Sequence, residues 1–164
     1  MPSSLKLNIK PVWEEIDVVR DQVHKFLTEN KFDINKIHAI VMTASELCEN
    51  AVKYGADSIK KDIISITIDI EKNEIITEVK NKIKDIEDSD LKRLDETIQW
   101  IRGYQNPFEA YIEKLKHIST KELEKGESGL GLVRIAYEGQ SILDFYVNEN
   151  DILAMSAVFK LKKE

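Results

Sequence analysis

Hydrophobic and polar residues alternate along five stretches of the chain, which is the pattern of strands with one buried face. In residues 63–71 every second residue is an isoleucine, and a two-residue turn leads to a second alternating stretch, residues 74–81. This pair predicts an antiparallel hairpin. The other alternating stretches are residues 5–10 and a closing hairpin of residues 141–147 and 152–161.

Five further segments carry apolar residues three or four positions apart, which predicts helices. Asp33 or Asn35 can cap the second of these helices, and Gly55 is placed to end it. The segments are residues 13–30, 33–54, 91–102, 107–118 and 130–137. Strands and helices in this order predict an α+β fold, a two-layer sandwich in which helices cover one face of a mostly antiparallel sheet.

Composition narrows the functional classes. The 164 residues suit a single domain spanning residues 1–164, and residues 82–125 form a helical insertion within it. The net charge of −6 argues against direct binding to nucleic acid, which needs a basic surface. No apolar run approaches the roughly 18 residues of a membrane span, and no signal peptide opens the sequence. We therefore expect a soluble, cytoplasmic protein whose single cysteine, Cys48, is a small buried residue.

The helix from residue 37 to 53 has a second face besides its apolar stripe. Glu46 and Asn50 are four residues apart, so their side chains can address one ligand together, and Lys53 points to the same side. Ala39 and Met42 share this face, which indicates that a ligand or other protein covers it. The alternative is that these are ordinary residues of a helix surface.

Three of the six glycines, Gly126, Gly129 and Gly131, lie in one short window before the helix of residues 130–137. Glycines let backbone amides approach an anion, and the start of a helix adds free N–H groups and a positive dipole end. The window therefore predicts a phosphate site that needs no basic patch. The alternative is a structural turn in which Gly129 and Gly131 allow close packing. The window is not a Walker A loop, since no G-K-[ST] follows.

The segment ELCENAVKYG at residues 46–55, followed by GLGL at residues 129–132, resembles the N box and the second glycine box of the GHKL family of ATP-binding domains. Within that family the chain looks most like the anti-sigma-factor serine kinases of bacterial partner switching. The resemblance implies the histidine-kinase-like ATPase fold, ATP and Mg²⁺ as cofactors, and helices of residues 82–125 that form or replace the lid over the nucleotide.

The resemblance also implies roles for individual residues. Asn50 matches the asparagine that holds magnesium, and Glu46 matches the acidic residue that orients or deprotonates the attacking group. Lys53 would pair with a phosphate. The residues around the phosphates would be Gly126, Gly129, Leu130 and Gly131.

The chain departs from the family at the first glycine box. Asn81 stands where the family has the aspartate that binds the adenine amino group, and Ile83 stands where it has a glycine. Asn81 can still accept a hydrogen bond through its carbonyl oxygen, and Asp85 is a weaker substitute. The adenine end is therefore altered and puts ATP affinity in question, whereas the phosphate end matches.

Three functional hypotheses follow. The first is a kinase that transfers phosphate from Mg-ATP to a serine or threonine of a small regulatory partner, such as an anti-sigma-antagonist-like domain. The second is a module of the same fold that sequesters a partner, for example a sigma factor, without ATP turnover. The third is an unrelated α+β domain. Two questions stay open: whether the chain is an enzyme, and whether it forms a homodimer.

The insertion is rich in aromatic residues, which either pack its helices on the sheet or bind a partner. They are Trp100, Tyr104, Phe108 and Tyr111.

Overall fold

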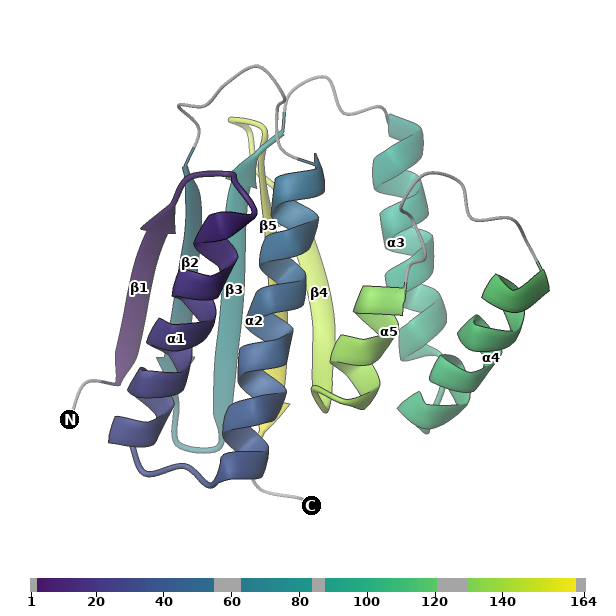
Figure 1. Ribbon diagram of the computed structural model, residues 1–164. Helices are drawn as coiled ribbons and strands as arrows, with labels where there is room; N and C mark the ends of the chain where they lie inside the picture. Colours follow the sequence, from purple (N-terminus) through teal and green to yellow (C-terminus); the bar gives the residue numbers. More distant parts are fainter. Residues whose placement is uncertain (1–2, 55–62, 84–87, 121–129, 162–164) are drawn as a thin grey trace.

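A computed structural model describes residues 3–54, 63–83, 88–120 and 130–161. The described residues form helices and strands in the predicted order (Figure 1). The elements are β1 (Ser4–Ile9), α1 (Glu14–Glu29), α2 (Ile34–Tyr54), β2 (Ile64–Ile70), β3 (Glu74–Lys82), α3 (Asp88–Arg102), α4 (Pro107–Thr120), α5 (Leu130–Tyr137), β4 (Ser141–Val147) and β5 (Ile152–Lys160).

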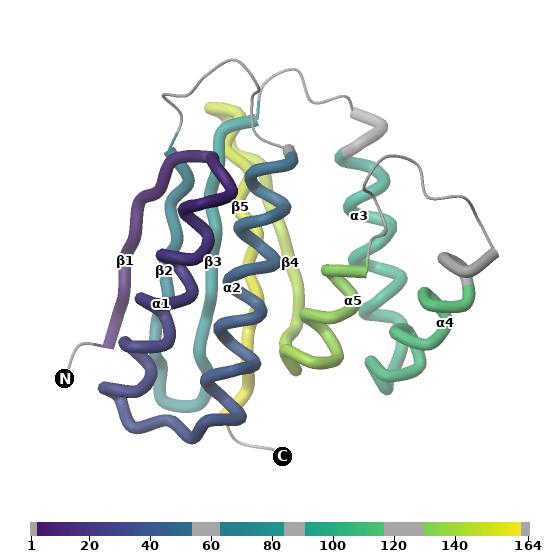
Figure 2. The backbone as a smooth tube through the Cα atoms, in the orientation of Figure 1, coloured from purple at the N-terminus to yellow at the C-terminus, as the bar shows by residue number. Residues whose placement is uncertain are grey.

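The strands form one antiparallel sheet in the order β1-β2-β3-β5-β4. Helices α1 and α2 lie side by side on one face of the sheet, and α5 continues this layer over β4 (Figure 1). The backbone trace shows α3 and α4 beyond α5, at the side of the molecule away from β1 (Figure 2). The predicted α+β fold with two layers is confirmed.

The alternating residues of the β2–β3 hairpin form the part of the hydrophobic core that the sheet contributes. Ile66 of β2 pairs with Val79 of β3, and Ile68 pairs with Thr77, and all four side chains are buried. Their neighbours along each strand are only partly buried, because successive side chains of a strand point to opposite faces. Every second residue of β3 therefore faces the helices, and Asn81 is the last of these inward-facing residues within the strand.

Helix α2 supplies the matching apolar stripe, and Ile40, Ala44, Leu47 and Cys48 are buried against the strands. Asp33 caps the helix by accepting a hydrogen bond of 3.0 Å from the backbone N–H of Lys36. The predicted cap at Asp33 is confirmed, whereas Gly55 lies outside the described residues.

Helix α1 differs from the prediction at its start. Ile16, Val19, Val23 and Phe26 are buried as expected, but Trp13 precedes the helix and its residue surface is 54% exposed. The chain has only just turned from β1 at this point, so the indole lies outside the contact between α1 and α2.

The helices of the insertion lie where the sequence predicts them, and their aromatic residues contact one another and Tyr137, while Tyr104 and Tyr111 also pack against the hydrophobic core. Trp100 and Tyr104 meet edge to face with ring centroids 5.1 Å apart. Phe108 and Tyr111 of α4 contact Tyr137 of α5, with centroid distances of 5.1 and 5.2 Å. The rings of Phe108 and Tyr111 therefore join α4 to α5, and the role of residues 82–125 as a lid stays a prediction.

The turn that follows α5 holds the end of this helix against α2. Gly139 donates its backbone N–H to the carbonyl oxygen of Arg134, and its own carbonyl accepts a hydrogen bond of 2.9 Å from the buried hydroxyl of Ser141. A Cβ atom on Gly139 would collide with the hydroxyl of Thr43 and lie 2.5 Å from the carbonyl oxygen of Ile135. Only glycine permits this approach.

We expect Gly139→Ala to destabilise the protein by about 1–3 kcal/mol, because the added methyl group meets a backbone oxygen that cannot move alone. Chemical denaturation measures the loss. Gly103→Ala is the control, since a Cβ there would lie 3.3 Å from the nearest backbone oxygen and should cost less than half as much. Equal losses at the two positions would contradict the close contact at Gly139.

Candidate functional site

Helices α1 and α5 of this chain cover part of the second face of α2, where the sequence predicted cover by a ligand or other protein, and Lys53 on this face is exposed. Ala39, Thr43 and Ser45 on this face are buried, and the side chain of Glu46 keeps only 16% of its exposure. A carboxylate with so little access to water must be matched by polar groups from the elements that cover it.

Helix α1 covers one flank of this face through Arg20. The Nε of Arg20 donates a hydrogen bond of 3.0 Å to the hydroxyl of Ser45, and Nη2 lies 3.6 Å from a carboxylate oxygen of Glu49. Nη1 of Arg20 donates a hydrogen bond of 2.7 Å to Oδ1 of Asp17 on the same helix. Arg20 is therefore a fixed cation beside the carboxylates of α2.

Helix α5 covers the other flank and contacts Glu46 directly. Nη1 of Arg134 donates a hydrogen bond of 3.0 Å to Oε1 of Glu46. The other oxygen, Oε2, occupies the space beside Gly131, because a Cβ atom there would lie 2.5 Å from it. A side chain at position 131 would therefore require Glu46 to move, which agrees with the structural alternative that the sequence left open.

The surroundings of Glu46 favour its protonated form. Burial raises the pKa of Glu46 above its ordinary value, and the negative charge of Glu49 raises this pKa further. The charges of Arg134 and Arg20 act in the opposite direction without cancelling the effect. A carboxylate with a raised pKa is a stronger proton acceptor than an ordinary one, which suits a general base.

Asn50 lies one helical turn after Glu46 and is partly buried, so its amide oxygen can serve as a ligand for a hard cation. Lys53 is exposed near the end of α2. The structure brings Glu46 of α2 and Gly131 of α5 together, whereas the place of Asn50 and Lys53 in a site stays a prediction. Leu130 and Gly131 are the first residues of α5, whereas Gly126 and Gly129 lie outside the described residues.

Asn81, the residue predicted to bind adenine, lies near the end of β3 and pairs with Leu153 of the neighbouring strand β5. Asn81 is buried, with 5% of its surface exposed, and its Nδ2 finds no hydrogen-bond partner among the described residues. Ile83 follows it on the same inward row and is also buried. Asp85 is outside the described residues. An unpartnered buried amide carries a free-energy cost, which a bound group with an acceptor would relieve.

Arg134 is the main residue of the site that the sequence did not indicate. It is the only charged residue between Leu130 and Tyr137, in a helix whose other inward side chains are apolar. A lone arginine in such a segment signals a fixed counter-charge nearby. Its partner is 88 positions away in the sequence, so the pairing itself needed the fold.

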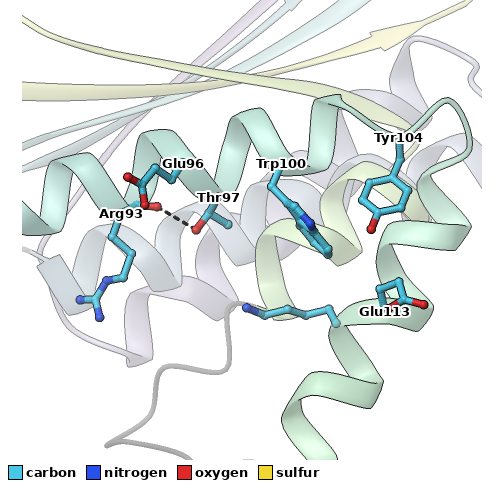
Figure 3. Close-up of a pocket in the computed structure, with 7 residues that line it drawn as sticks. Arg93, Glu96, Thr97, Trp100, Tyr104 and Glu113 are labelled. Atoms are coloured by element: carbon cyan, nitrogen blue, oxygen red, sulfur yellow. Dashed lines mark hydrogen bonds between the residues drawn. The ribbon is translucent and has the colours of Figure 1, made fainter.

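A hollow of about 390 Å³ lies apart from this site, between α3 and α4. Figure 3 shows Trp100 and Tyr104 of α3 and its following turn on one side, with Glu113 of α4 facing them. Arg93, Glu96, Thr97 and Lys114 complete the lining. Cations and carboxylates are balanced there, so the hollow indicates no ligand of a definite charge.

Two further properties concern the described residues only. They contain no group of three or more histidine, cysteine, aspartate or glutamate side chains able to hold a metal ion. No helix among them is both long enough and apolar enough to cross a bilayer. Cys48 is buried, as predicted, and burial raises the pKa of its thiol to about 12.

Gly131→Ala should destabilise the protein by about 1 kcal/mol, because the methyl group displaces the carboxylate of Glu46 from its contact with Arg134. In a Glu46→Ala background the same change should be neutral or stabilising, since the space is free and alanine favours helix. Denaturation of the four proteins gives the coupling free energy. An equal effect of Gly131→Ala in both backgrounds would show that the two residues do not compete for this space.

No family model matches the sequence, and no curated protein matches it. Solved structures do match the fold. A chain of the SiaB-SiaC complex from Pseudomonas aeruginosa superposes with a TM-score of 0.72 and 18% sequence identity, over 94% of this chain and 88% of that one.

The crystal structure of the RsbU and RsbW domains of Rv1364c from Mycobacterium tuberculosis gives a TM-score of 0.54 and 14% identity. This match covers 100% of the present chain but only 34% of that longer chain. At these identities the likeness concerns the fold. The antiparallel sheet and its layer of helices are the fold that this chain shares with these two structures, and this architecture is consistent with the GHKL-like ATPase fold that the sequence predicted.

Proposed function

We propose that this chain is a regulatory protein of partner switching that transfers phosphate from Mg-ATP to a small partner protein. The observation that carries the proposal is the largely buried Glu46, which lies beside Gly131 in the first turn of α5 and has Asn50 one helical turn later on α2. In this proposal Glu46 would act as the proton acceptor and Asn50 as the oxygen ligand of a cation, and the N-terminus of α5 beside Glu46 would favour anions.

Phosphoryl transfer depends mainly on positioning and on neutralising charge. Mg-ATP, when bound, supplies the phosphoryl group, and the amide oxygen of Asn50 would hold the metal together with phosphate oxygens. Glu46 would accept the proton of the attacking hydroxyl at its carboxylate. Its raised pKa and its position on a rigid helix suit that task. Lys53 would contribute a positive charge at the end of α2.

The end of the site near β3 fits a nucleobase through Asn81. Its unpartnered Nδ2 can donate to a ring nitrogen of adenine, while its carbonyl oxygen can accept from the amino group. The amide thus offers a donor as well as an acceptor, where an aspartate would offer acceptors alone. This property supports nucleotide binding in spite of the changed residue.

The similar structures suggest the kind of partner. One of them is a complex of SiaB with SiaC, and in the other an RsbW domain accompanies an RsbU domain. We therefore propose a regulatory protein as the substrate, in the manner of an anti-sigma-antagonist domain, with a sigma factor as the other candidate partner.

Ile83 favours a second candidate function. Its side chain is buried on the inward row directly after Asn81, where the family has a glycine. A filled adenine pocket would leave a domain that acts by sequestering its partner, without turnover of ATP. The two functions differ in whether nucleotide binds at all.

Mg-ATP should raise the stability of the wild-type protein, since a ligand that binds only the native state stabilises it. A nucleotide concentration of about 100 Kd adds about 2.7 kcal/mol. At about 2–4 °C per kcal/mol, this raises Tm by roughly 5–10 °C. Asn50→Ala should abolish the part of the rise that requires Mg²⁺. Asn35→Ala, at the exposed start of the same helix, should keep the wild-type response.

The magnesium-dependent rise in Tm would support the nucleotide-binding proposal. The same rise in Asn50→Ala and in wild type would remove Asn50 from the metal site. No rise at millimolar Mg-ATP would contradict the kinase proposal and favour sequestration.

A further inference from the structure

The side chain of Arg134 is held at both sides by carboxylates. Nη1 donates to Oε1 of Glu46 at 3.0 Å, while Nε and Nη2 donate to one oxygen of Glu138 at 3.1 and 3.0 Å. Glu138 lies four residues further along the chain, in the turn that follows α5, so it anchors the guanidinium to its own segment. Arg134 therefore presents one N–H group of a fixed planar fork to α2.

We propose that Arg134 is a positioning residue, which fixes the carboxylate of Glu46 through Oε1 and so orients the proton acceptor of the site. The inference rests on the proposed function for the role of Glu46, but the contact itself does not depend on it. The guanidinium holds one oxygen of this carboxylate, and the absence of a side chain at Gly131 leaves the space that the other oxygen occupies.

Such fixation matters because Glu46 has a flexible side chain that can adopt several rotamers. A carboxylate that is free to change rotamer spends part of its time out of reach of the hydroxyl that it must deprotonate. Displacement of a reacting group by about 1 Å can cost roughly 100-fold in rate. Arg134 lies on the helix that forms the opposite wall of the site, so it fixes Glu46 relative to that wall.

The charged groups around Glu46 give Arg134 a second, measurable effect. Arg20 of α1, Glu49 of α2 and Arg134 of α5 surround the carboxylate, while Glu138 and the Tyr111 side chain of α4 act on the charge of Arg134. The inward side chains of β3 beneath α2 are uncharged. Burial and Glu49 raise the pKa of Glu46, and Arg134 lowers it. Loss of Arg134 must therefore raise this pKa further.

The test is a ¹³C NMR titration of the Glu46 side-chain carboxyl in the nucleotide-free full chain. Arg134→Met should raise the pKa of Glu46 above the wild-type value, and Arg134→Lys should give a value between the two. Lys160→Met is the matched control, because it removes a cation from an exposed ion pair with Glu74, and it should leave Glu46 unchanged. Arg134 is itself 36% exposed, so its replacement leaves the buried core intact.

A pKa of Glu46 that is the same in wild type, Arg134→Met and Lys160→Met would overturn the inference. If the chain proves to transfer phosphate, Arg134→Met should also lower kcat by roughly 10- to 100-fold while the affinity for Mg-ATP stays within about twofold. A normal kcat in this variant would equally overturn the positioning role. The titration needs no nucleotide, so it tests the contact between Arg134 and Glu46 even if the chain transfers no phosphate. Failure of this inference can therefore be distinguished from failure of the proposed function.

Discussion

Helix α5 lies against α2 through close contacts near both of its ends, and the ion pair between Glu46 and Arg134 lies between them. At the start of α5, Gly131 leaves room for a carboxylate oxygen. Beyond its end, Gly139 lets the backbone approach the hydroxyl of Thr43. A side chain at Gly131 would displace the carboxylate of Glu46, and one at Gly139 would collide with Thr43 and with the backbone of Ile135. The candidate site exists because this approach brings the first turn of α5 to the second face of α2.

Most of the fold could be predicted from the sequence because its signals are local. The isoleucines of β2 and the apolar stripe of α2 have clear periods, and the hairpins and α5 lie where these periods place them. Contacts between elements that are distant in the sequence were harder to predict. Trp13 continues the helical spacing but is exposed, and the contact of the Phe108 and Tyr111 rings with Tyr137 of α5 has no signal in the sequence. Periodicity shows that a residue is apolar, whereas the tertiary arrangement determines what it meets.

The site was predicted in outline and corrected in detail. Glu46 lies on a covered face, as expected, and the roles of Asn50 and Lys53 stay predictions. Gly131 was expected beside phosphates, but the structure also gives it a packing role against Glu46. Arg134 was missed because its partner belongs to a helix far away in the sequence. The chain has a net charge of −6, and the positive charges beside Glu46 and Glu49 come from Arg20 of α1 and Arg134 of α5.

The central claim is that a nucleotide binds between the second half of α2 and the start of α5, with its base at the end of β3. The most direct measurement is a ¹H–¹⁵N NMR titration with Mg²⁺ and a non-hydrolysable ATP analogue. The account predicts that the backbone amides of Asn50 and Gly131 and the side-chain amide of Asn81 shift together. Shifts confined to the hollow at Trp100 and Tyr104, or no shifts at all, would contradict it.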